Sequence, residues 1–488
     1  MNTANPASGS ELPASIVTNP TGAADSLTFD QLPLAPATLA NLLQLGYRQM
    51  TPIQAASLPL ALAGQDLIAQ AKTGSGKTAA FALPLLTKLN PRRFAVQALV
   101  LCPTRELADQ VTQEIRRLAR SADNIKVLTL CGGSTMRPQI SSLEHGAHVV
   151  VGTPGRIMDH LQRNSLDLTA LDTLVLDEAD RMLDMGFYDD IAFVANACPK
   201  QRQTLLFSAT YPEGIAGLAR KFLRQPQQIT LHEQHQPGKI RQRFYEVDAE
   251  QKLAAVALLL NHYRPVSTLA FCNTRQQCRD LLEVLRAEGF VALALHGEME
   301  QRERDQVLIQ FANRSCSVLV ATDVAARGLD IDQLEAVINV DVTPDTEVHV
   351  HRIGRTGRVD QEGWAFSLVS GNQMARVDNI EKLLGHDIEW HTLSELTPTR
   401  GAGPLLPPMA TLQILGGRKE KIRPGDVLGA LTGDAGFSKE QIGKIKVAEA
   451  STYVAVARNI AKEAVRKLSA GTVKGKRVKV HLLQETAG

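Results

Sequence analysis

The sequence predicts an α/β protein with two successive parallel-sheet domains and a small α+β domain after them. Three observations lead to this prediction: short apolar runs alternate with helical patterns, this alternation stops once and starts again, and the net charge of the chain changes from negative to positive near residue 400. The chain has 488 residues, a length that allows about three domains at roughly 150 residues each. Its 44% hydrophobic and 21% charged residues are ordinary for a globular protein and exclude a chain disordered throughout.

The first α/β region begins after a polar lead. Residues 1–26 are rich in Ala, Ser, Thr, Asn and Pro, and we expect them to be disordered. From about Phe29, apolar runs alternate with helical patterns such as 105–120. The apolar runs are residues 95–102, 148–152 and 173–177. Fully apolar strands between helices indicate a parallel sheet covered on both faces, in a domain that we place at 27–232.

The same alternation of apolar runs and helical patterns returns after a polar linker, HEQHQPGKI at 232–240. Apolar runs at 267–272, 317–323 and 336–341 predict the strands of a second α/β domain, which we place at 233–396. A segment rich in Pro and Gly follows at 397–408, and this composition is typical of a linker.

The remaining segment, 409–488, has a different pattern. Its expected elements are strand 411–415, helix 424–432, strands 442–448 and 451–457, helix 459–468 and strand 478–483. This β-α-β-β-α-β order is the split βαβ arrangement, which RRM domains use to bind RNA.

The formal net charge of +2 hides a division of charge along the chain. Residues 401–488 carry 15 Lys and Arg against 7 Asp and Glu, whereas residues 1–400 carry 38 against 44. An acidic body with a basic end is the asymmetry expected of a protein that anchors to a polyanion. A basic surface that is merely solvated is the alternative interpretation of the same residues.

The cysteines and the apolar stretches indicate where the protein works. The six cysteines form no C-x-x-C pair, which argues against a zinc ribbon or a disulfide framework and favours a reducing compartment. The start of the chain, MNTANPASGS, holds no positive segment followed by an apolar run. No apolar stretch approaches the roughly 18 residues of a membrane span. We therefore expect a cytoplasmic protein.

The segment AKTGSGKT at 71–78 is the strongest local signal for a nucleotide. A glycine-rich turn between a strand and a helix lets backbone N–H groups cradle phosphates at the helix N-terminus. Lys77 would reach the β- and γ-phosphates, and the Thr78 hydroxyl would hold Mg²⁺. The phosphate-binding residues expected here are Ala71, which stands where the general pattern has glycine, with Thr73, Gly74, Ser75, Gly76, Lys77 and Thr78.

The acidic segment DEAD at 177–180 follows the apolar run TLVL, at the strand end where open α/β sheets bind ligands. Asp177 is placed to hold Mg²⁺ through water, and Glu178 is placed to orient and deprotonate the attacking water. Two adjacent acids at a strand end are, alone, more often a helix N-cap. Their place about 100 residues after the glycine-rich turn favours the nucleotide interpretation.

With other ordered blocks, these segments resemble the DEAD-box family of ATP-dependent RNA helicases over nearly all of residues 29–370. GYRQMTPIQ at 46–54 is similar to the family's Q motif. This likeness implies that Gln54 reads the adenine edge, that Tyr47 packs on the base and that Phe29 is the isolated upstream aromatic residue.

The resemblance also implies how hydrolysis is coupled to strand separation. SAT at 208–210 resembles the coupling element, through Ser208 and Thr210, and HRIGRTGR at 351–358 supplies its partners His351 and Arg352. Positive charge on the transferred phosphoryl group would come from Arg355 and Arg358, three residues apart, as arginine fingers. The family also places Asp330 near the ATP ribose.

Several short blocks would face RNA by the same resemblance. They are PTREL, Gly132–Gly133 and TPGR in the first domain, and CNTR, HGEMEQRER and ATD in the second. The residues implied are Thr104, Arg105, Gly133, Thr153, Arg156, Asn273, Arg275, His296, Gly297 and Thr322. Each of them alone has an ordinary explanation, such as a helix cap or a surface charge, but their ordered set favours RNA contact.

The segment GGRKEKIRPGDVLGALTGDAGFSKEQIGKI at 416–445 resembles the C-terminal RNA-binding domain of the DbpA subgroup of this family. The likeness covers about 409–483. That subgroup acts on 23S ribosomal RNA during assembly of the large ribosomal subunit, so 23S ribosomal RNA and large-subunit precursors are the implied partners.

The residues of this last domain predict backbone contacts more clearly than base recognition. An RRM ordinarily stacks bases on two or three aromatic residues of its sheet, and the strands here offer Tyr453 only. The basic candidates are Arg418, Lys419, Lys421, Arg423, Lys444 and Lys446, supported by the run 474–479. Phosphate contacts give affinity without reading the sequence, so the residues that read bases stay open.

These observations predict two tandem RecA-like domains followed by an RRM-like α+β domain. The expected function is ATP-dependent RNA unwinding with ATP and Mg²⁺, by a monomer that locally remodels ribosomal RNA. The alternatives are an ATP-dependent RNA clamp, a general RNA helicase without ribosomal RNA specificity, a DNA helicase, and an RNA chaperone that acts through its tail.

Overall fold

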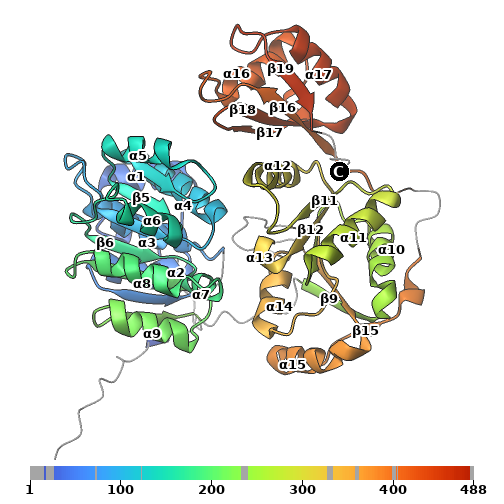
Figure 1. Cartoon of the computed structure of the whole chain (residues 1–488), viewed down its shortest axis with the longest axis horizontal. Helices are drawn as coiled ribbons and strands as arrows, with labels where there is room; N and C mark the ends of the chain where they lie inside the picture. Colours follow the sequence, from blue (N-terminus) through green and yellow to red (C-terminus); the bar gives the residue numbers. More distant parts are fainter. Residues whose placement is uncertain are drawn as a thin grey trace, which may run out of the picture. The chain divides into compact units, whose positions relative to one another are not determined.

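The structure of the chain is a computed structural model, and Figure 1 shows its order of elements. It describes residues 16–17, 27–71, 74–122, 124–231, 240–326, 334–357, 362–397, 403 and 405–483. By its internal contacts the chain divides into two units near residue 235. The first unit holds one parallel sheet, and the second holds another parallel sheet and a small antiparallel one, which confirms the predicted fold class.

The first unit is built on an eight-stranded sheet whose strands all pair in parallel. Its order is β1-β8-β2-β7-β6-β3-β5-β4. The strands are β1 (Ile16–Val17), β2 (Leu67–Gln70), β3 (Ala98–Leu101), β4 (Val127–Leu130), β5 (Val149–Gly152), β6 (Thr173–Leu176), β7 (Gln203–Ser208) and β8 (Gln227–Thr230). The strand β1 lies inside the segment expected to be disordered, where its backbone pairs with β8.

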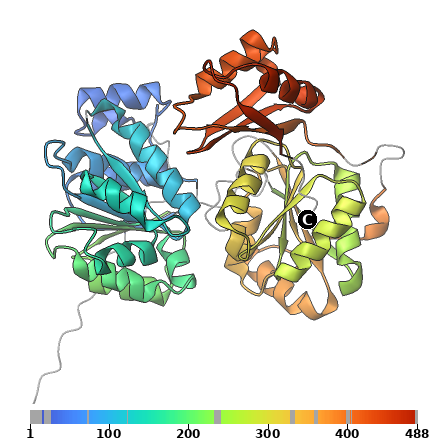
Figure 2. The same cartoon turned by 45° about the horizontal axis from the view of Figure 1, so that its top comes forward.

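The apolar runs predicted as strands are buried because helices cover both faces of this sheet (Figure 2). Along β2, Leu67 and Ala69 pack into one apolar core while Ile68 packs into another, as alternation across a sheet requires. The helices are α1 (Pro36–Gln44), α2 (Pro52–Leu62), α3 (Lys77–Lys88), α4 (Arg105–Leu118), α5 (Met136–Glu144), α6 (Pro154–Gln162), α7 (Ala179–Asp184), α8 (Tyr188–Ala197) and α9 (Glu213–Phe222).

The second unit begins with a seven-stranded parallel sheet in the order β11-β12-β10-β13-β14-β9-β15. Its strands are β9 (Ile240–Glu246), β10 (Thr268–Cys272), β11 (Ala292–Leu295), β12 (Val318–Thr322), β13 (Ala336–Asn339), β14 (Gly363–Val369) and β15 (Trp390–His391). Its helices are α10 (Lys252–Tyr263), α11 (Arg275–Ala287), α12 (Gln301–Ala312), α13 (Asp323–Ala326), α14 (Thr346–Ile353) and α15 (Met374–Leu384).

The C-terminal domain has the predicted β-α-β-β-α-β order. Its antiparallel sheet, β17-β18-β16-β19, consists of β16 (Met409–Leu415), β17 (Ile442–Val447), β18 (Ser451–Ala457) and β19 (Lys479–Leu482). Its helices are α16 (Pro424–Gly429), which continues as a π-helical turn at Ala430–Asp434, and α17 (Ala461–Ala470). Leu412 and Ile414 of β16 are fully buried in one apolar core with residues of both helices.

A buried polar cluster joins this domain to the second α/β domain. The Thr411 hydroxyl accepts a hydrogen bond from Asn313 Nδ2 at 3.1 Å and lies 2.6 Å from the Ser315 hydroxyl. Arg458 donates to the Ser315 carbonyl at 3.3 Å. Because Thr411 alternates with the core residue Leu412, it lies on the sheet face turned away from the helices. That face is therefore covered at Thr411, which is fully buried.

The second α/β domain also buries a histidine. His349 of α14 is fully buried, and neither ring nitrogen has a hydrogen-bond partner among the described residues. Its ring centroid lies 6.0 Å from that of Phe244, which in turn contacts Trp390. Burial, reinforced by the Arg352 charge, lowers the pKa of His349 from 6.5 to about 4.

We predict that His349 makes the stability of this domain depend on pH. Between pH 4 and 6.5 the unfolded chain binds a proton at this histidine that the folded chain does not. The free energy of unfolding should therefore fall as pH is lowered through this window, by up to about 3 kcal/mol. His349→Leu should flatten this slope in urea unfolding followed by tryptophan fluorescence.

Tryptophan fluorescence reports on the second α/β domain, because both tryptophans, Trp364 and Trp390, lie in it. His386→Gln, which changes an exposed histidine after α15, is the matched control and should keep the slope. An unaltered slope in His349→Leu would contradict the prediction.

Candidate active site

The glycine-rich turn lies at the carboxyl end of β2, between β2 and α3. Its first residue, Ala71, donates its backbone N–H to the Ser208 carbonyl at 3.0 Å, which ties the turn to the end of β7. Gly74 and Gly76 have φ angles of +81° and +92°, which favour glycine. Lys77, the first residue of α3, is 6% exposed and its Nζ donates to the Ala71 carbonyl at 2.9 Å. The predicted Thr73 lies outside the described residues.

Gln54 connects the Q-motif segment to this turn. It is 1% exposed, its Oε1 accepts from the Thr51 backbone N–H at 2.9 Å, and its Nε2 donates to the Gly76 carbonyl at 3.0 Å. A Cβ on Gly76 would lie 2.5 Å from that Nε2. The two segments, 22 residues apart, are therefore fitted to each other at the phosphate-binding turn.

The upstream aromatic residue Phe29 packs against Tyr47 of the Q-motif segment. The rings of Phe29 and Tyr47 meet edge to face at 6.0 Å, and Phe29 is buried in the core. The Tyr47 hydroxyl donates to Glu114 Oε1 at 2.6 Å. Burial and this hydrogen bond raise the pKa of Tyr47, so the phenol stays protonated. The structure thus fixes the Tyr47 ring against α4.

The acidic segment leaves the end of β6. Asp177 and Glu178 are 3% and 4% exposed. Burial raises the pKa of Asp177, and the Lys77 charge offsets that effect in part. Glu178 adopts a left-handed backbone, φ 51° and ψ 51°, immediately before α7. Lys77, which follows β2, therefore lies near Asp177 and Glu178, which follow β6, at the same edge of the sheet with β7 between the two strands.

A divalent cation fits the oxygen donors at this place. Oδ1 of Asp177 is buried and has no hydrogen-bond partner among the described residues. The Thr78 hydroxyl stands next to Lys77 in α3. Mg²⁺ prefers oxygen ligands such as these, so Asp177 and Thr78 are the residues that would hold it.

Asp180 joins the acidic segment to the SAT segment. Its Oδ2 accepts from the backbone N–H groups of Ala209 and Thr210 at 3.0 and 2.9 Å and from the Thr210 hydroxyl at 3.1 Å. The Ser208 hydroxyl in turn accepts the Asp180 backbone N–H at 3.3 Å. Burial alone would raise the pKa of Asp180, but the Lys77 charge and these hydrogen bonds lower it. A displacement of the acidic segment or of the SAT segment must therefore be transmitted to the other through these hydrogen bonds.

The predicted RNA-facing residues of the first domain meet in two groups. The Arg105 guanidinium lies against Gly133, whose φ is +71° and where any Cβ would collide with it. Arg156 donates to the Ser134 carbonyl at 3.1 Å and to Gln139 Oε1 at 3.1 Å. Thr104 and Thr153 are the N-cap residues of α4 and α6. All of these residues follow β3, β4 and β5, at one edge of the sheet.

In the second domain Arg352 ties the strand ends together. It is 2% exposed and donates to both carboxylate oxygens of Asp323 at 2.7 and 2.6 Å. It also donates to Asn339 Oδ1, the Asp341 carbonyl and Asn273 Oδ1 at 3.3, 2.8 and 3.2 Å. The expected RNA contact Asn273 is therefore held by the expected coupling residue Arg352.

The other predicted residues of the second domain are placed as follows. Arg275 pairs with Glu298 at 2.6 Å, His296 and Gly297 follow β11, Thr322 ends β12, and His351 lies in α14. Burial lowers the pKa of His296. Arg355 is 6% exposed in the turn after α14. Asp330 and Arg358 lie outside the described residues.

The basic residues of the C-terminal domain are exposed. Arg418, Lys419, Lys421, Arg423, Lys444 and Lys446 all present their side chains to solvent. Lys474 Nζ donates to the Lys421 carbonyl at 2.5 Å, which brings the run 474–479 beside the turn at 418–421. Tyr453 is 6% exposed, with its hydroxyl 3.4 Å from Gln413 Nε2. Charge rather than an open aromatic surface is what this domain offers.

Sequence reasoning missed several residues of the site. Asp180 was read only as part of its segment, and Arg181, which forms a buried ion pair with Glu178, was not considered. Asp323 and Asn339, which hold Arg352, were also missed. Their positions in the sequence could have identified them. Asp180 and Arg181 stand beside predicted site residues, and Asp323 and Asn339 stand at the ends of strands.

Comparison with known proteins follows the same divisions of the chain. Three family models match: DEAD/DEAH box helicase over residues 51–218, helicase conserved C-terminal domain over 251–360, and DbpA RNA binding domain over 411–482. ATP-dependent RNA helicase DbpA of Escherichia coli (strain K12) is 51% identical over 452 residues, 92% of this chain and 98% of that protein. DEAD-box ATP-dependent RNA helicase CshA of Geobacillus kaustophilus is 41% identical, covering 74% of this chain and 78% of the relative.

Solved structures resemble the α/β part. S. cerevisiae Dbp5 bound to RNA and ADP BeF3 has a TM-score of 0.68 and 31% identity, covering 75% of this chain and 96% of that chain. Mss116p bound to ssRNA and AMP-PNP has a TM-score of 0.69 and 25% identity, covering 78% and 82% of the two chains. Among the described residues, no helix is long and apolar enough to cross a membrane.

We predict that Gln54→Ala weakens ATP binding about tenfold, because it removes both the proposed adenine contact and the bond that supports Gly76. Gln54→Glu keeps the acceptor for the Thr51 N–H and loses the donor, so it should lower the affinity as well. Titration with a fluorescent ATP analogue measures the effect. Gln201→Ala, at an exposed position just before β7, is the control, and ATP affinity equal to the parent in Gln54→Ala would contradict the assignment.

Proposed function

Because the chain belongs to the DEAD-box family of ATP-dependent RNA helicases and is of the DbpA type, we propose that its RNA substrate is ribosomal RNA. The target that we propose is 23S ribosomal RNA during assembly of the large ribosomal subunit. The C-terminal domain supports this proposal, since it matches the DbpA RNA binding domain and carries an exposed basic surface. The match to the DbpA RNA binding domain is the single observation that carries it.

The residues of the first domain have distinct roles in ATP hydrolysis. Phe29, Tyr47 and Gln54 bind the adenine side, and the turn at 71–78 holds the phosphates with Lys77 at the β- and γ-phosphates. Glu178 orients the attacking water and accepts its proton. Asp177 and Thr78 would hold Mg²⁺, which would neutralise charge on the phosphates when bound.

The second domain contributes the remaining charge. Arg355 and Arg358 stabilise the transferred phosphoryl group, and such a finger is worth on the order of 10³–10⁵ in rate. Asp330 binds the ribose. Because these residues belong to a different domain from Lys77 and Glu178, hydrolysis needs both domains. Ser208 and Thr210, linked to Asp180, pass the state of the ATP site to the RNA-facing loops, with His351 and Arg352 acting from the second domain.

RNA is gripped by its backbone along the strand ends. Thr104, Arg105, Gly133, Thr153 and Arg156 hold one strand in the first domain, and Asn273, Arg275, His296, Gly297 and Thr322 hold it in the second. Opening ten base-pair steps costs on the order of 14 kcal/mol if RNA resembles the DNA average of roughly 1.4 per step. One ATP cycle therefore disrupts a few pairs and the rest dissociate thermally, which gives local remodelling of short duplexes.

The C-terminal domain anchors the enzyme to its target. Arg418, Lys419, Lys421, Arg423, Lys444 and Lys446 bind phosphates of a ribosomal RNA segment, with Tyr453 as a further candidate. Anchoring raises the concentration of neighbouring helices at the helicase domains. The enzyme acts as a monomer in the cytoplasm, where its six cysteines, which are buried and form no disulfide, stay reduced.

The main alternative is an ATP-dependent RNA clamp, which would retain RNA without releasing a strand. A general RNA helicase would lack preference for ribosomal RNA. A DNA helicase is disfavoured by the RNA-binding domain and would respond equally to DNA. A passive chaperone would act through the C-terminal domain without hydrolysis.

Steady-state ATPase activity with different nucleic acids tests the proposed target. We expect 23S ribosomal RNA to stimulate more strongly than 16S ribosomal RNA, poly(U), tRNA or duplex DNA. Arg418→Gln with Lys421→Gln should raise the concentration of 23S ribosomal RNA that gives half-maximal stimulation. The double substitution should also make RNA binding less dependent on salt, since each lost phosphate contact reduces the slope of log K against log salt concentration by about 0.7–0.9.

The matched control removes two exposed charges elsewhere, Lys200→Gln with Lys382→Gln, and should behave as the parent. Equal stimulation by every RNA, unaltered in Arg418→Gln with Lys421→Gln, would leave a general RNA helicase and refute the proposed anchoring.

We predict that Glu178→Gln lowers the rate of ATP hydrolysis by about 10²–10⁴, because the amide cannot accept the proton of the attacking water. The side chain keeps its size, so ATP binding should persist. Release of a labelled strand from a short RNA duplex should be lost with hydrolysis under multiple turnover. A variant that hydrolyses no ATP yet still remodels RNA at the parent's rate would favour the passive chaperone.

A further inference from the structure

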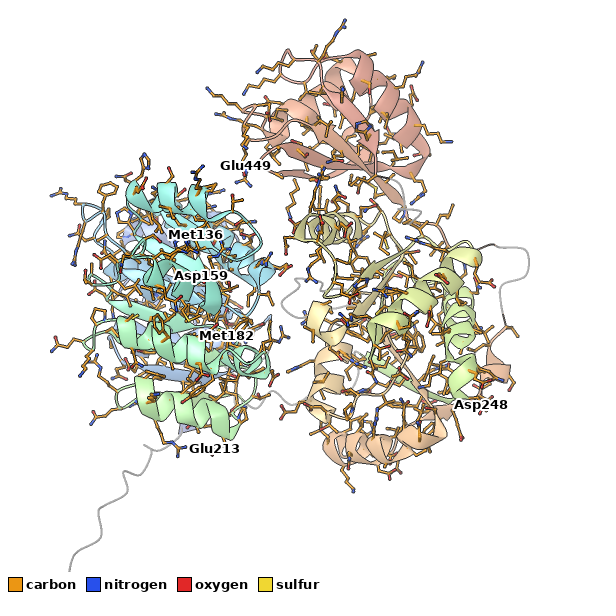
Figure 3. All side chains as sticks on the ribbon, in the orientation of Figure 1. Met136, Asp159, Met182, Glu213, Asp248 and Glu449 are labelled. Carbon is orange, nitrogen blue, oxygen red and sulfur yellow. The ribbon has the colours of Figure 1, made fainter. Side chains whose placement is uncertain are left out.

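A buried ion pair lies beside the reacting groups. Arg181 Nη1 donates to Glu178 Oε2 at 2.8 Å, and the two side chains are 9% and 5% exposed. Glu178 immediately precedes α7 and Arg181 lies within it, in a short helix of the first unit that also carries Met182, which Figure 3 labels. Arg181 is not part of the phosphate-binding turn or of the RNA-facing loops.

The backbone explains why this arginine can reach the glutamate. Glu178 is the N-cap of α7 and Arg181 stands three residues later, a spacing that puts both side chains on one side of the helix. The helix itself is fixed, because Asp180 accepts three hydrogen bonds from Ala209 and Thr210. A rigid helix therefore presents the guanidinium to the carboxylate in one geometry.

Glu178 needs such a partner. It is buried next to the carboxylates of Asp177 and Asp180, and a buried carboxylate is stable only when it is paired or hydrogen-bonded. The left-handed backbone at Glu178 restricts where its side chain can point. Among the described residues, Arg181 is the one whose side chain donates to Glu178 in the structure. The contact uses Oε2 and leaves Oε1 outside the ion pair.

We propose that Arg181 is a positioning residue for ATP hydrolysis: it holds the Glu178 carboxylate by one oxygen so that the other faces the attacking water. This inference rests on the proposed role of Glu178 as the base. A planar guanidinium fixes the orientation of a carboxylate better than a flexible ammonium does. Small misplacement of a catalytic group can cost up to about 10²-fold in rate.

The test measures RNA-stimulated ATPase activity of the full chain at saturating RNA. Arg181→Met, which keeps much of the volume and removes the charge, should lower kcat at least about tenfold, while KM for ATP stays within about twofold. Arg181→Lys should recover part of the loss. Arg220→Met is the control, because Arg220 pairs with Glu213 on the surface of the same domain, with side chains 57% and 85% exposed, and kcat should be unaltered.

A double substitution separates positioning from a structural role. If Arg181 acts through Glu178, adding Arg181→Met to Glu178→Gln should cause little further loss of kcat, because the group that it positions is already gone. A full additional loss in that background, an unaltered or raised kcat in Arg181→Met, or a loss in Arg181→Met that appears equally in KM would overturn the proposal. If Glu178→Gln alone leaves kcat at the parent's value, the assignment of the base fails instead.

Discussion

The direction of the strands is the constraint on which the rest of the structure depends. Every strand pair in the two larger sheets is parallel, so all their carboxyl ends lie at one edge of each sheet. Segments far apart in sequence, the glycine-rich turn after β2, the acidic segment after β6 and the SAT segment after β7, are thereby neighbours. One edge of the first sheet holds both the phosphate-binding and the RNA-facing residues, and this closeness is what allows one to influence the other.

Buried charge gives this edge its chemistry. Asp177, Glu178 and Asp180 are all nearly inaccessible to solvent, and Lys77 and Arg181 are the buried cations among them. Each carboxylate has a different environment. Among the described residues, Oδ1 of Asp177 has no hydrogen-bond partner, Glu178 forms an ion pair with Arg181, and Asp180 accepts hydrogen bonds from the SAT segment. These three environments suit the three roles that we propose, namely cation binding for Asp177, proton acceptance for Glu178 and coupling for Asp180. In the second sheet Arg352 performs the corresponding structural task by binding four residues at the ends of three strands, β10, β12 and β13.

Most of the fold was predictable because each apolar run is a buried strand and each glycine-rich or acidic motif follows one. The β-α-β-β-α-β order of the last domain was predictable for the same reason. Contacts between elements were not: hydrophobic periodicity cannot show that Thr411 bonds to Asn313 or that the Arg105 guanidinium lies against Gly133. The ion pair of Arg181 stands beside the left-handed backbone of Glu178, a conformation that a non-glycine residue rarely adopts and that sequence does not reveal.

Hydrogen exchange of the full chain, alone and with a non-hydrolysable ATP analogue and 23S ribosomal RNA together, tests the central claim most directly. If one edge of the first sheet carries the function, protection should gather in the segments after the strands, at 74–78, 104–107, 132–134, 153–156 and 177–181. The segments before the strands, such as 64–66, 124–126 and 201–202, should be unaltered. Protection confined to this opposite edge would contradict the account.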